Sequence, residues 1–140
     1  MKFLLDTCVI SEGRKPVPHP SVVSWFRRAE YASLFVSALT LGGLEKGALR
    51  LPEGRKKQDL LEWIHDEVIP RFEGHIVPVD DRVALKWGEL QANAERIGKP
   101  LPILDSLLAA TALVHDLTIV TRNNPDMEVT GVPLLNPWNS

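Results

Sequence analysis

Short apolar runs alternate with helical patterns along this chain, and this alternation limits the fold more than any other feature. Strands are expected at residues 3–5, 34–36, 76–77, 117–120 and, as a short edge strand, 132–135. Helices are expected between them, at residues 21–30, 40–49, 55–69 (with Pro70 just beyond), 81–97 and 102–115. The strand segments are continuously apolar, which is typical of strands buried on both faces of a parallel sheet. The sequence therefore predicts an α/β fold of three layers, α/β/α, with a mostly parallel central sheet of four to five strands.

Length and composition are those of one globular domain. The chain has 140 residues, of which 44% are hydrophobic, so residues 1–140 are expected to enclose one core. No apolar run approaches the about 20 residues that cross a bilayer, and the N-terminal apolar stretch is too short for a signal peptide. Cys8 is the one cysteine, which excludes an internal disulfide. These features predict a cytoplasmic protein without membrane association.

Charge gives no general attraction for nucleic acid, because 16 Lys and Arg stand against 18 Asp and Glu, for a net charge of −2. Basic residues nevertheless gather locally, at Arg14-Lys15, Arg27-Arg28 and Arg55-Lys56-Lys57. Such clusters are typical of a solvated mixed surface, or of a rim that faces phosphate where the fold brings them together.

Three aspartates are candidates for one site. In an open parallel sheet, ligands bind beyond the carboxyl ends of the strands. Asp6 follows the first strand, Asp126 lies six residues after the fourth, and Asp105 lies in the first turn of an apolar helix. Carboxylates from such distant segments repel one another at short range unless a cation neutralises them, and Mg²⁺ or Mn²⁺ prefers oxygen ligands. The pattern indicates a metal site that activates water for phosphodiester hydrolysis.

Each aspartate also has a purely structural interpretation. Asp6 would then satisfy backbone N–H groups in a turn, Asp105 would complement a helix N-terminus, and Asp126 would be an ordinary loop residue. Asp105 distinguishes the two interpretations best, because its neighbours are apolar and an unpaired buried charge is costly there.

Four ordered segments resemble the motifs of PIN-domain ribonucleases, and together they span nearly the whole chain. Residues 4–12 (LLDTCVISE) resemble the opening motif, 37–47 (SALTLGGLEKG) the second and 105–112 (DSLLAATA) the third. The last segment, 117–123 (LTIVTRN) with Asp126, Gly131-Val132 and Asn136-Pro137-Trp138, resembles the close of VapC-type toxins, notably the FitB-like branch.

This resemblance implies a PIN fold and a metal-dependent endoribonuclease toxin of a type II toxin–antitoxin system. It implies that Asp6, Asp105 and Asp126 hold Mg²⁺, with Mn²⁺ as a substitute, and that Asn123 is a neutral ligand or a ligand positioner. It also implies a VapB-type antitoxin partner, a homodimer or a heteromer with the antitoxin, and contact with operator DNA only through the antitoxin. The expected location is a bacterial or archaeal cytoplasm.

One position departs from the family pattern. The second motif has the form Thr-x-x-Glu, with the glutamate as a metal-site acid, whereas Thr40 is followed three residues later by Gly43. Glu45 is two residues further on and points to another face of the helix, so it does not replace the lost acid. Gly43 implies either a weakened nuclease or a substitution that permits production of a toxic protein.

The remaining candidates have two interpretations each. Arg122, Arg14 and Lys15 are expected either to contact RNA phosphate or to be solvated loop residues. Thr121 and Ser106 are expected either to orient a ligand or to serve as cap and turn hydroxyls. Cys8 is interpreted as a small apolar side chain behind Asp6.

Two functions other than ribonuclease are considered. Without one of its acids, the chain would be a catalytically impaired binding module that holds an antitoxin and helps to regulate operator DNA. A phospho-acceptor receiver domain also has an acidic pocket on a parallel α/β fold, but it needs paired acids after the first strand and a lysine after the last. The segments Asp6-Thr7 and Leu135-Asn136-Pro137 do not supply them.

Overall fold

A computed structural model describes residues 1–122 and 124–139. Five parallel strands form the sheet in the order β3-β2-β1-β4-β5. Their bounds are β1 Phe3–Leu5, β2 Leu34–Ser37, β3 Ile76–Val77, β4 Thr118–Val120 and β5 Leu134–Leu135. The first strand therefore lies at the centre, where Leu4 is in register with Phe35 of β2 and with Ile119 of β4. The predicted parallel α/β architecture is confirmed.

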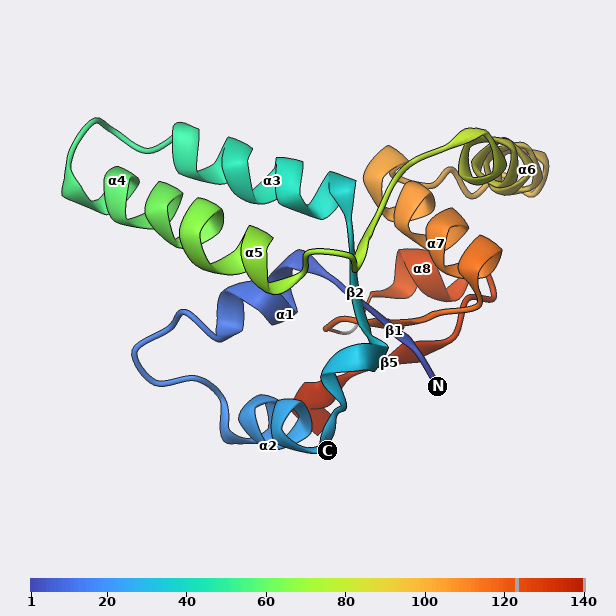
Figure 1. The fold of residues 1–140 in the computed structure, drawn as a ribbon. Coiled ribbons are helices and arrows are strands. Elements are labelled where there is room, and N and C mark those ends of the chain that lie inside the picture. The colour runs from blue at the N-terminus through green and yellow to red at the C-terminus, as the bar shows by residue number, and fades with distance from the viewer. Residues whose placement is uncertain (123, 140) are drawn as a thin grey trace.

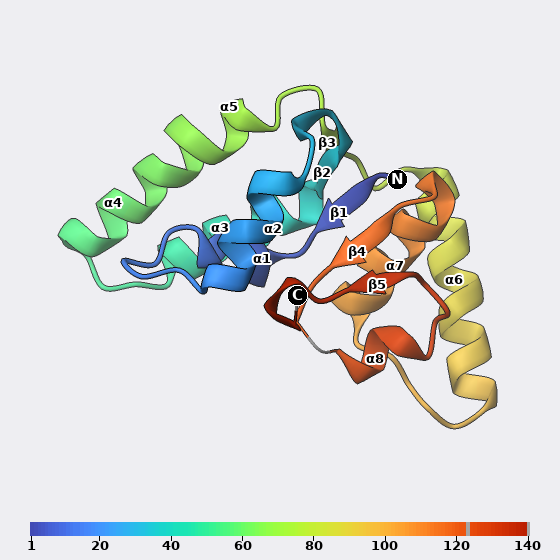
Figure 2. The ribbon, with the colours of Figure 1, turned by 90° about the horizontal axis from the view of Figure 1, so that it is seen from below.

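Helices cover both faces of this sheet. They are α1 Thr7–Glu12, α2 Pro20–Arg28, α3 Ala38–Leu49, α4 Arg55–Glu62, α5 Ile69–Arg71, α6 Asp81–Arg96, α7 Ile103–His115 and α8 Pro125–Glu128. Short 3-10 helices occupy Tyr31–Ser33 (η1) and Pro137–Asn139 (η3). Figures 1 and 2 show α1 to α5 on one side of the sheet and α6 to α8 on the other. No helix in the described part of the chain is long and apolar enough to cross a membrane.

Two core clusters reflect the alternation of side chains along the strands. On one face, Leu5 and Val36 pack with residues of α1 to α4. On the other face, Leu4 and Ile119 pack with α7 residues such as Ala109. Because both faces of each strand are covered, the strands are continuously apolar in sequence.

The helix predicted at 55–69 continues beyond its expected end. A π-helical segment, η2, spans Trp63–Val68 and leads into α5, which contains Pro70. The prediction that Pro70 lies outside the helix is wrong. Pro70 lies inside this continuous helix, directly after the π-helical segment, and the helix ends one residue later, at Arg71. The missing N–H of Pro70 therefore removes a donor only in the last turn.

Candidate carboxylate site and adjoining groove

Asp6 lies where the central strand ends and is fixed by two hydrogen bonds. Its Oδ1 accepts from the backbone N–H of Thr7 at 2.7 Å, which caps the N-terminus of α1. Its Oδ2 accepts from the hydroxyl of Thr121 at 2.8 Å. Leu5 and Val120 are paired in register on adjacent parallel strands, so the next residue of each strand reaches the same edge of the sheet. Thr121 thus orients the Asp6 carboxylate.

Asp105 lies in the first turn of α7 and is half-buried. Burial raises the pKa of its carboxyl group above the ordinary value, and the negative charges of Asp6 and Asp126 raise it further. A hydrogen bond from the side chain of Asn124 opposes this shift in pKa. Because Asp105 responds to both other charges, the structure brings the three predicted aspartates into one electrostatic environment.

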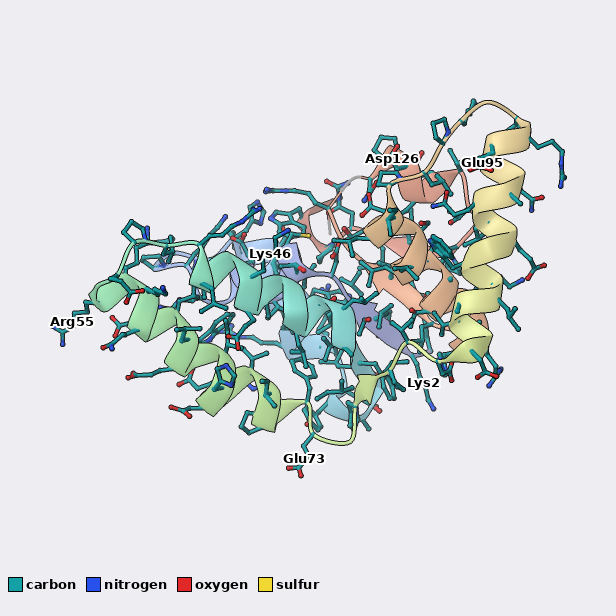
Figure 3. All side chains as sticks on the ribbon, turned by 90° about the horizontal axis from the view of Figure 1, so that it is seen from above. Lys2, Lys46, Arg55, Glu73, Glu95 and Asp126 are labelled. Atoms are coloured by element: carbon teal, nitrogen blue, oxygen red, sulfur yellow. The ribbon has the colours of Figure 1, made fainter. Side chains whose placement is uncertain are left out.

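Asp126 is exposed in α8, beside the beginning of α7 (Figure 3). Asn124 precedes it as the N-cap of that helix and accepts from the backbone N–H groups of Asp126 at 3.1 Å and of Met127 at 3.3 Å. With its carbonyl oxygen so engaged, the amide group of Asn124 donates to Asp105. The sequence signal for this residue was its place before Pro125, which is typical of a helix start, but the prediction selected Asn123 instead. Asn123 lies outside the described residues.

The chemistry of these donors fits a hard divalent cation. All of the donor atoms are oxygens, the ligands that Mg²⁺ and Mn²⁺ prefer. Burial is the main cause of the raised pKa of Asp105, and the charges of Asp6 and Asp126 add to it. Within residues 1–122 and 124–139, no three His, Cys, Asp or Glu side chains lie close enough together to enclose a metal ion. The site is therefore a set of neighbouring carboxylates, of which Asp6 is hydrogen-bonded to the backbone N–H of Thr7 and to the Thr121 hydroxyl.

Gly43 faces this site from α3. A Cβ atom at this position would meet only the Thr7 hydroxyl oxygen, at 4.0 Å, so a side chain fits without a clash. One turn earlier, Thr40 has a buried hydroxyl without a hydrogen-bond partner among the described residues. Residues three apart on a helix are neighbours, so a glutamate at position 43 would lie beside both hydroxyls. The position that the motif comparison assigns to an acid is thus open space next to Asp6.

The basic residues near the site differ in how they are engaged. Arg122 directly follows Thr121, and its guanidinium carbon lies 4.5 Å from the ring centre of Trp138. Arg14 lies beyond the C-terminal end of α1, opposite the end that Asp6 caps, with its guanidinium carbon 5.3 Å from the ring centre of Trp63. Lys15 forms an ion pair with Glu12 at 2.9 Å. Of the three, Arg122 is the one that the strand order brings beside Asp6.

Ser106 and Cys8 have structural contacts. The Ser106 hydroxyl is buried, donates to the Pro102 carbonyl at 2.8 Å and accepts from Trp87 and Gln91 of α6 at 3.0 and 2.8 Å. It therefore joins α6 to α7, as a turn hydroxyl would. Cys8 packs against the core behind Asp6, as the apolar interpretation predicts. Its sulfur also forms a hydrogen bond with the Thr121 hydroxyl at 3.7 Å, a contact that this interpretation did not include.

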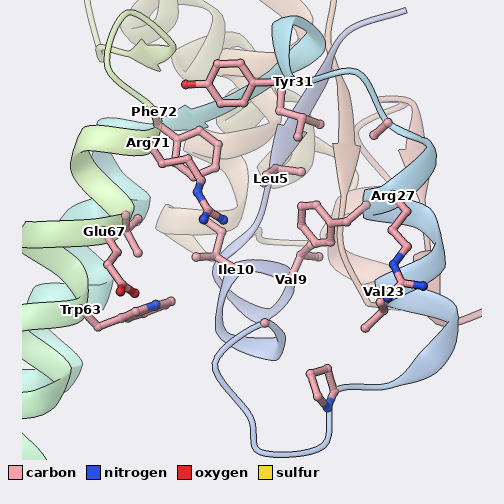
Figure 4. Close-up of a pocket in the computed structure, with 16 residues that line it drawn as sticks. Leu5, Val9, Ile10, Val23, Arg27, Tyr31, Trp63, Glu67, Arg71 and Phe72 are labelled. Carbon is pink, nitrogen blue, oxygen red and sulfur yellow. The ribbon is translucent and has the colours of Figure 1, made fainter.

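An apolar groove adjoins the site on the α1 side of the sheet. Its volume is about 560 Å³, and it lies between α2 on one side and η2 and α5 on the other. Figure 4 shows its floor, formed by Leu5, Val9 and Ile10, and charged side chains at its rim, Arg27, Glu67 and Arg71. Sequence reasoning did not find this groove, because its lining comes from seven separate helices and strands, whose apolar residues each resemble core residues.

A parallel sheet with carboxylates beyond its central strand is the arrangement of a PIN domain, and the PIN domain family model matches residues 3–131. The chain belongs to the PIN-domain family. It is 36% identical to toxin FitB of Neisseria gonorrhoeae over 137 residues, which is 98% of this chain and 99% of FitB. It is 32% identical to VapC ribonuclease Y4jK of Sinorhizobium fredii, covering 97% of each chain.

The solved structure of FitAB bound to an IR36 DNA fragment contains a chain with the same fold. The TM-score is 0.90, the identity is 34%, and the match covers 97% of this chain and 95% of that one. PIN-domain nucleases of the VapC type generally use divalent metal ions. The suspected family and the predicted fold are therefore confirmed.

Proposed function

We propose that this chain, as one domain over residues 1–140, is the endoribonuclease toxin of a type II toxin–antitoxin system. One arrangement carries the proposal: Thr121 holds Asp6 at the carboxyl end of the central strand, where α/β proteins bind ligands. Asp105 and Asp126, in the first turns of α7 and α8, lie near enough for their charges to interact. The similarity of the chain to FitB and to a VapC ribonuclease supports the same activity. The substrate is RNA, and the reaction is hydrolysis of a phosphodiester bond.

In this proposal Asp6, Asp105 and Asp126 would hold Mg²⁺, or Mn²⁺ in its place, with Asn123 as an additional neutral ligand or positioner. The bound cation supplies charge for the scissile phosphate and lowers the pKa of water. Thr121 holds the Asp6 carboxylate in a fixed orientation through the 2.8 Å hydrogen bond. Arg122 contacts a phosphate near the cleaved bond, and Arg14 and Lys15, which follow α1, contact the RNA backbone farther away.

Gly43 lowers this activity, because one carboxylate of the family site is absent. The absence of this carboxylate also supports the second candidate function, a PIN-fold binding module that holds an antitoxin and helps to regulate operator DNA. Calorimetry with Mn²⁺ distinguishes the two. Binding heat that disappears in Asp105→Asn supports the nuclease, whereas the absence of heat in the unmodified chain supports the binding module.

A VapB-type antitoxin is the proposed partner, and the apolar groove is its docking surface. The groove has an apolar floor and charged rim residues, which is how a protein interface is usually divided. Operator DNA would be bound through the antitoxin, as the FitAB complex with DNA suggests. The proposed assembly is a homodimer or a heteromer with the antitoxin, in a prokaryotic cytoplasm.

The decisive experiment compares the unmodified chain with Asp6→Asn and Asp105→Asn in RNA cleavage with Mg²⁺ and with chelator. Asparagine preserves the shape of each side chain, and at position 6 it also preserves the helix cap. We expect cleavage that depends on Mg²⁺ and is lost in both variants, with circular dichroism spectra unchanged. Cleavage retained by either folded variant contradicts the mechanism.

A further inference from the structure

Arg122 is held next to the carboxylate site by a ring from the end of the chain. It follows Thr121, whose hydroxyl donates to Asp6 at 2.8 Å, and its own side chain is exposed. Its guanidinium carbon lies 4.5 Å from the ring centre of Trp138 in η3. The buried carboxylate of Glu12, at the end of α1, lies near enough that the charge of Arg122 contributes to its lowered pKa. The position of this cation is therefore defined before any RNA binds.

The type of contact decides what the guanidinium can still bind. A guanidinium carries five N–H donors, and a contact with the face of one aromatic ring leaves most of them directed elsewhere. Across residues 1–122 and 124–139, no ion pair or hydrogen bond engages these donors. Glu12 instead pairs with Lys15 at 2.9 Å and accepts from the backbone N–H of His19 at 2.8 Å. Arg122 thus has a fixed orientation and free donors.

Trp138 is itself well anchored. Its backbone N–H donates to the Asn136 side chain at 2.9 Å, and its ring packs against the core cluster that contains Leu5 and Val120. A ring that is fixed by the core restricts the rotamers of the arginine stacked on it. Because fewer rotamers are then lost on binding, phosphate contact costs less side-chain entropy.

We propose that Trp138 is a positioning residue, which holds Arg122 so that its free N–H groups meet a phosphate of bound RNA. This inference rests on the proposed ribonuclease function and identifies how the chain supports its phosphate-binding cation. A stacked arginine suits a planar, bidentate contact with phosphate oxygens.

Equilibrium binding of a fluorescein-labelled single-stranded RNA of mixed sequence, measured by anisotropy over a series of KCl concentrations, tests the inference. Arg122→Gln should weaken binding and reduce the slope of log K against log salt by about 0.7, the loss of one phosphate contact on a single strand. Trp138→Leu should weaken binding about two- to fivefold, the equivalent of one exposed cation–π contact. Trp138→Phe keeps a ring, loses only an indole N–H that has no partner among the described residues, and should bind like the unmodified chain.

A double-mutant cycle separates positioning from a general effect on the fold. In the Arg122→Gln background, Trp138→Leu should weaken RNA binding no further. In the free protein, NMR should show the Arg122 Nε–H resonance displaced by the Trp138 ring current, and this displacement should vanish in Trp138→Leu. Equal loss of binding with and without Arg122, or an unshifted resonance, would overturn the inference.

The same samples distinguish this inference from the proposed activity. RNA that is bound with the expected pattern but not cut by the unmodified chain refutes the ribonuclease and leaves the role of Trp138 intact. RNA that is cut, while Arg122→Gln changes neither affinity nor salt slope, refutes the role of Trp138 and leaves the ribonuclease intact. An unmodified chain that does not bind RNA overturns the inference as well.

Discussion

Restoring a glutamate at position 43 gives the sharpest test of the carboxylate site. A Cβ atom at Gly43 meets nothing closer than the Thr7 hydroxyl at 4.0 Å, and one at Gly42 meets nothing within 4 Å. Gly43→Glu and Gly42→Glu therefore add the same charge to the same helix without a clash. The neighbouring position points the carboxylate in a different direction, since successive helical residues differ by about 100°. Gly42→Glu is thus a matched control.

The magnitudes follow from helix propensity and charge. Replacing glycine inside a helix should stabilise either variant by about 0.5 to 1 kcal/mol, which raises Tm by about 2 °C in a chain of this size. At position 43 the new carboxylate also enters the environment of Asp6 and Asp105, with a repulsion on the order of 1 kcal/mol for each pair. In chelator, Gly42→Glu should therefore raise Tm, and Gly43→Glu should leave it unchanged or lower it. Mg²⁺ should reverse this order.

Cleavage of labelled RNA with Mg²⁺, followed on denaturing gels, provides the second measurement. Gly43→Glu should increase the rate by about two orders of magnitude, the usual contribution of one preorganised charged or polar group in an active site. Gly42→Glu should leave the rate unchanged. If both variants respond to Mg²⁺ alike in Tm and in cleavage, the assignment of position 43 to the site is wrong.

Four further predictions concern individual side chains. Asp6→Ala should cost about 1 kcal/mol of folding stability through loss of the α1 cap, whereas Asp6→Asn should cost less, as urea unfolding would show. The raised pKa of Asp105 means that its ionised form is disfavoured in the folded state. In the presence of a chelator, the protein should therefore gain stability as pH falls toward that pKa. Asp105→Asn should abolish this gain in Tm measurements over a pH series. The pKa of Glu12 is lowered by its contacts with Lys15 and the His19 backbone. Its contribution to stability is therefore complete above the pKa of the unfolded state and is lost as pH falls through the pKa of the folded state. Glu12→Gln should reduce the fall of Tm at acid pH. Ser106→Ala should cost about 1 to 3 kcal/mol, because it leaves the Trp87 indole N–H without its acceptor and removes one of the two hydrogen bonds of the Gln91 amide. RNA cleavage per folded molecule should stay the same.

The continuous apolar runs were sufficient to predict the sheet. Each run, such as Phe3–Leu5, is short and apolar on both faces because helices cover both sides. Helix α1 could not be found in this way. It has six residues and begins one residue after β1, so it is too short for its apolar residues Val9 and Ile10 to show a helical period.

Position within the fold also explains which site residues were found. Asp6 and Asp105 were predicted from the end of a strand and the start of a helix, and the structure brings their charges together. Asn124 was missed because its contact with Asp105 depends on the path of the chain between β4 and α8. The role of Ser106 was undecided in sequence, since only the packing of α6 against α7 supplies the donors that occupy its hydroxyl.

The central place of the first strand has a consequence for biosynthesis. During translation β1 emerges first, but one of its neighbours, β4, is made from residues 118–120, near the end of the chain. Asp6 can form its hydrogen bond with Thr121, and come near the charges of Asp105 and Asp126, only after these later residues have left the ribosome. A chain that stops before residue 118 therefore lacks β4 and Thr121, and the carboxylate site cannot form in it.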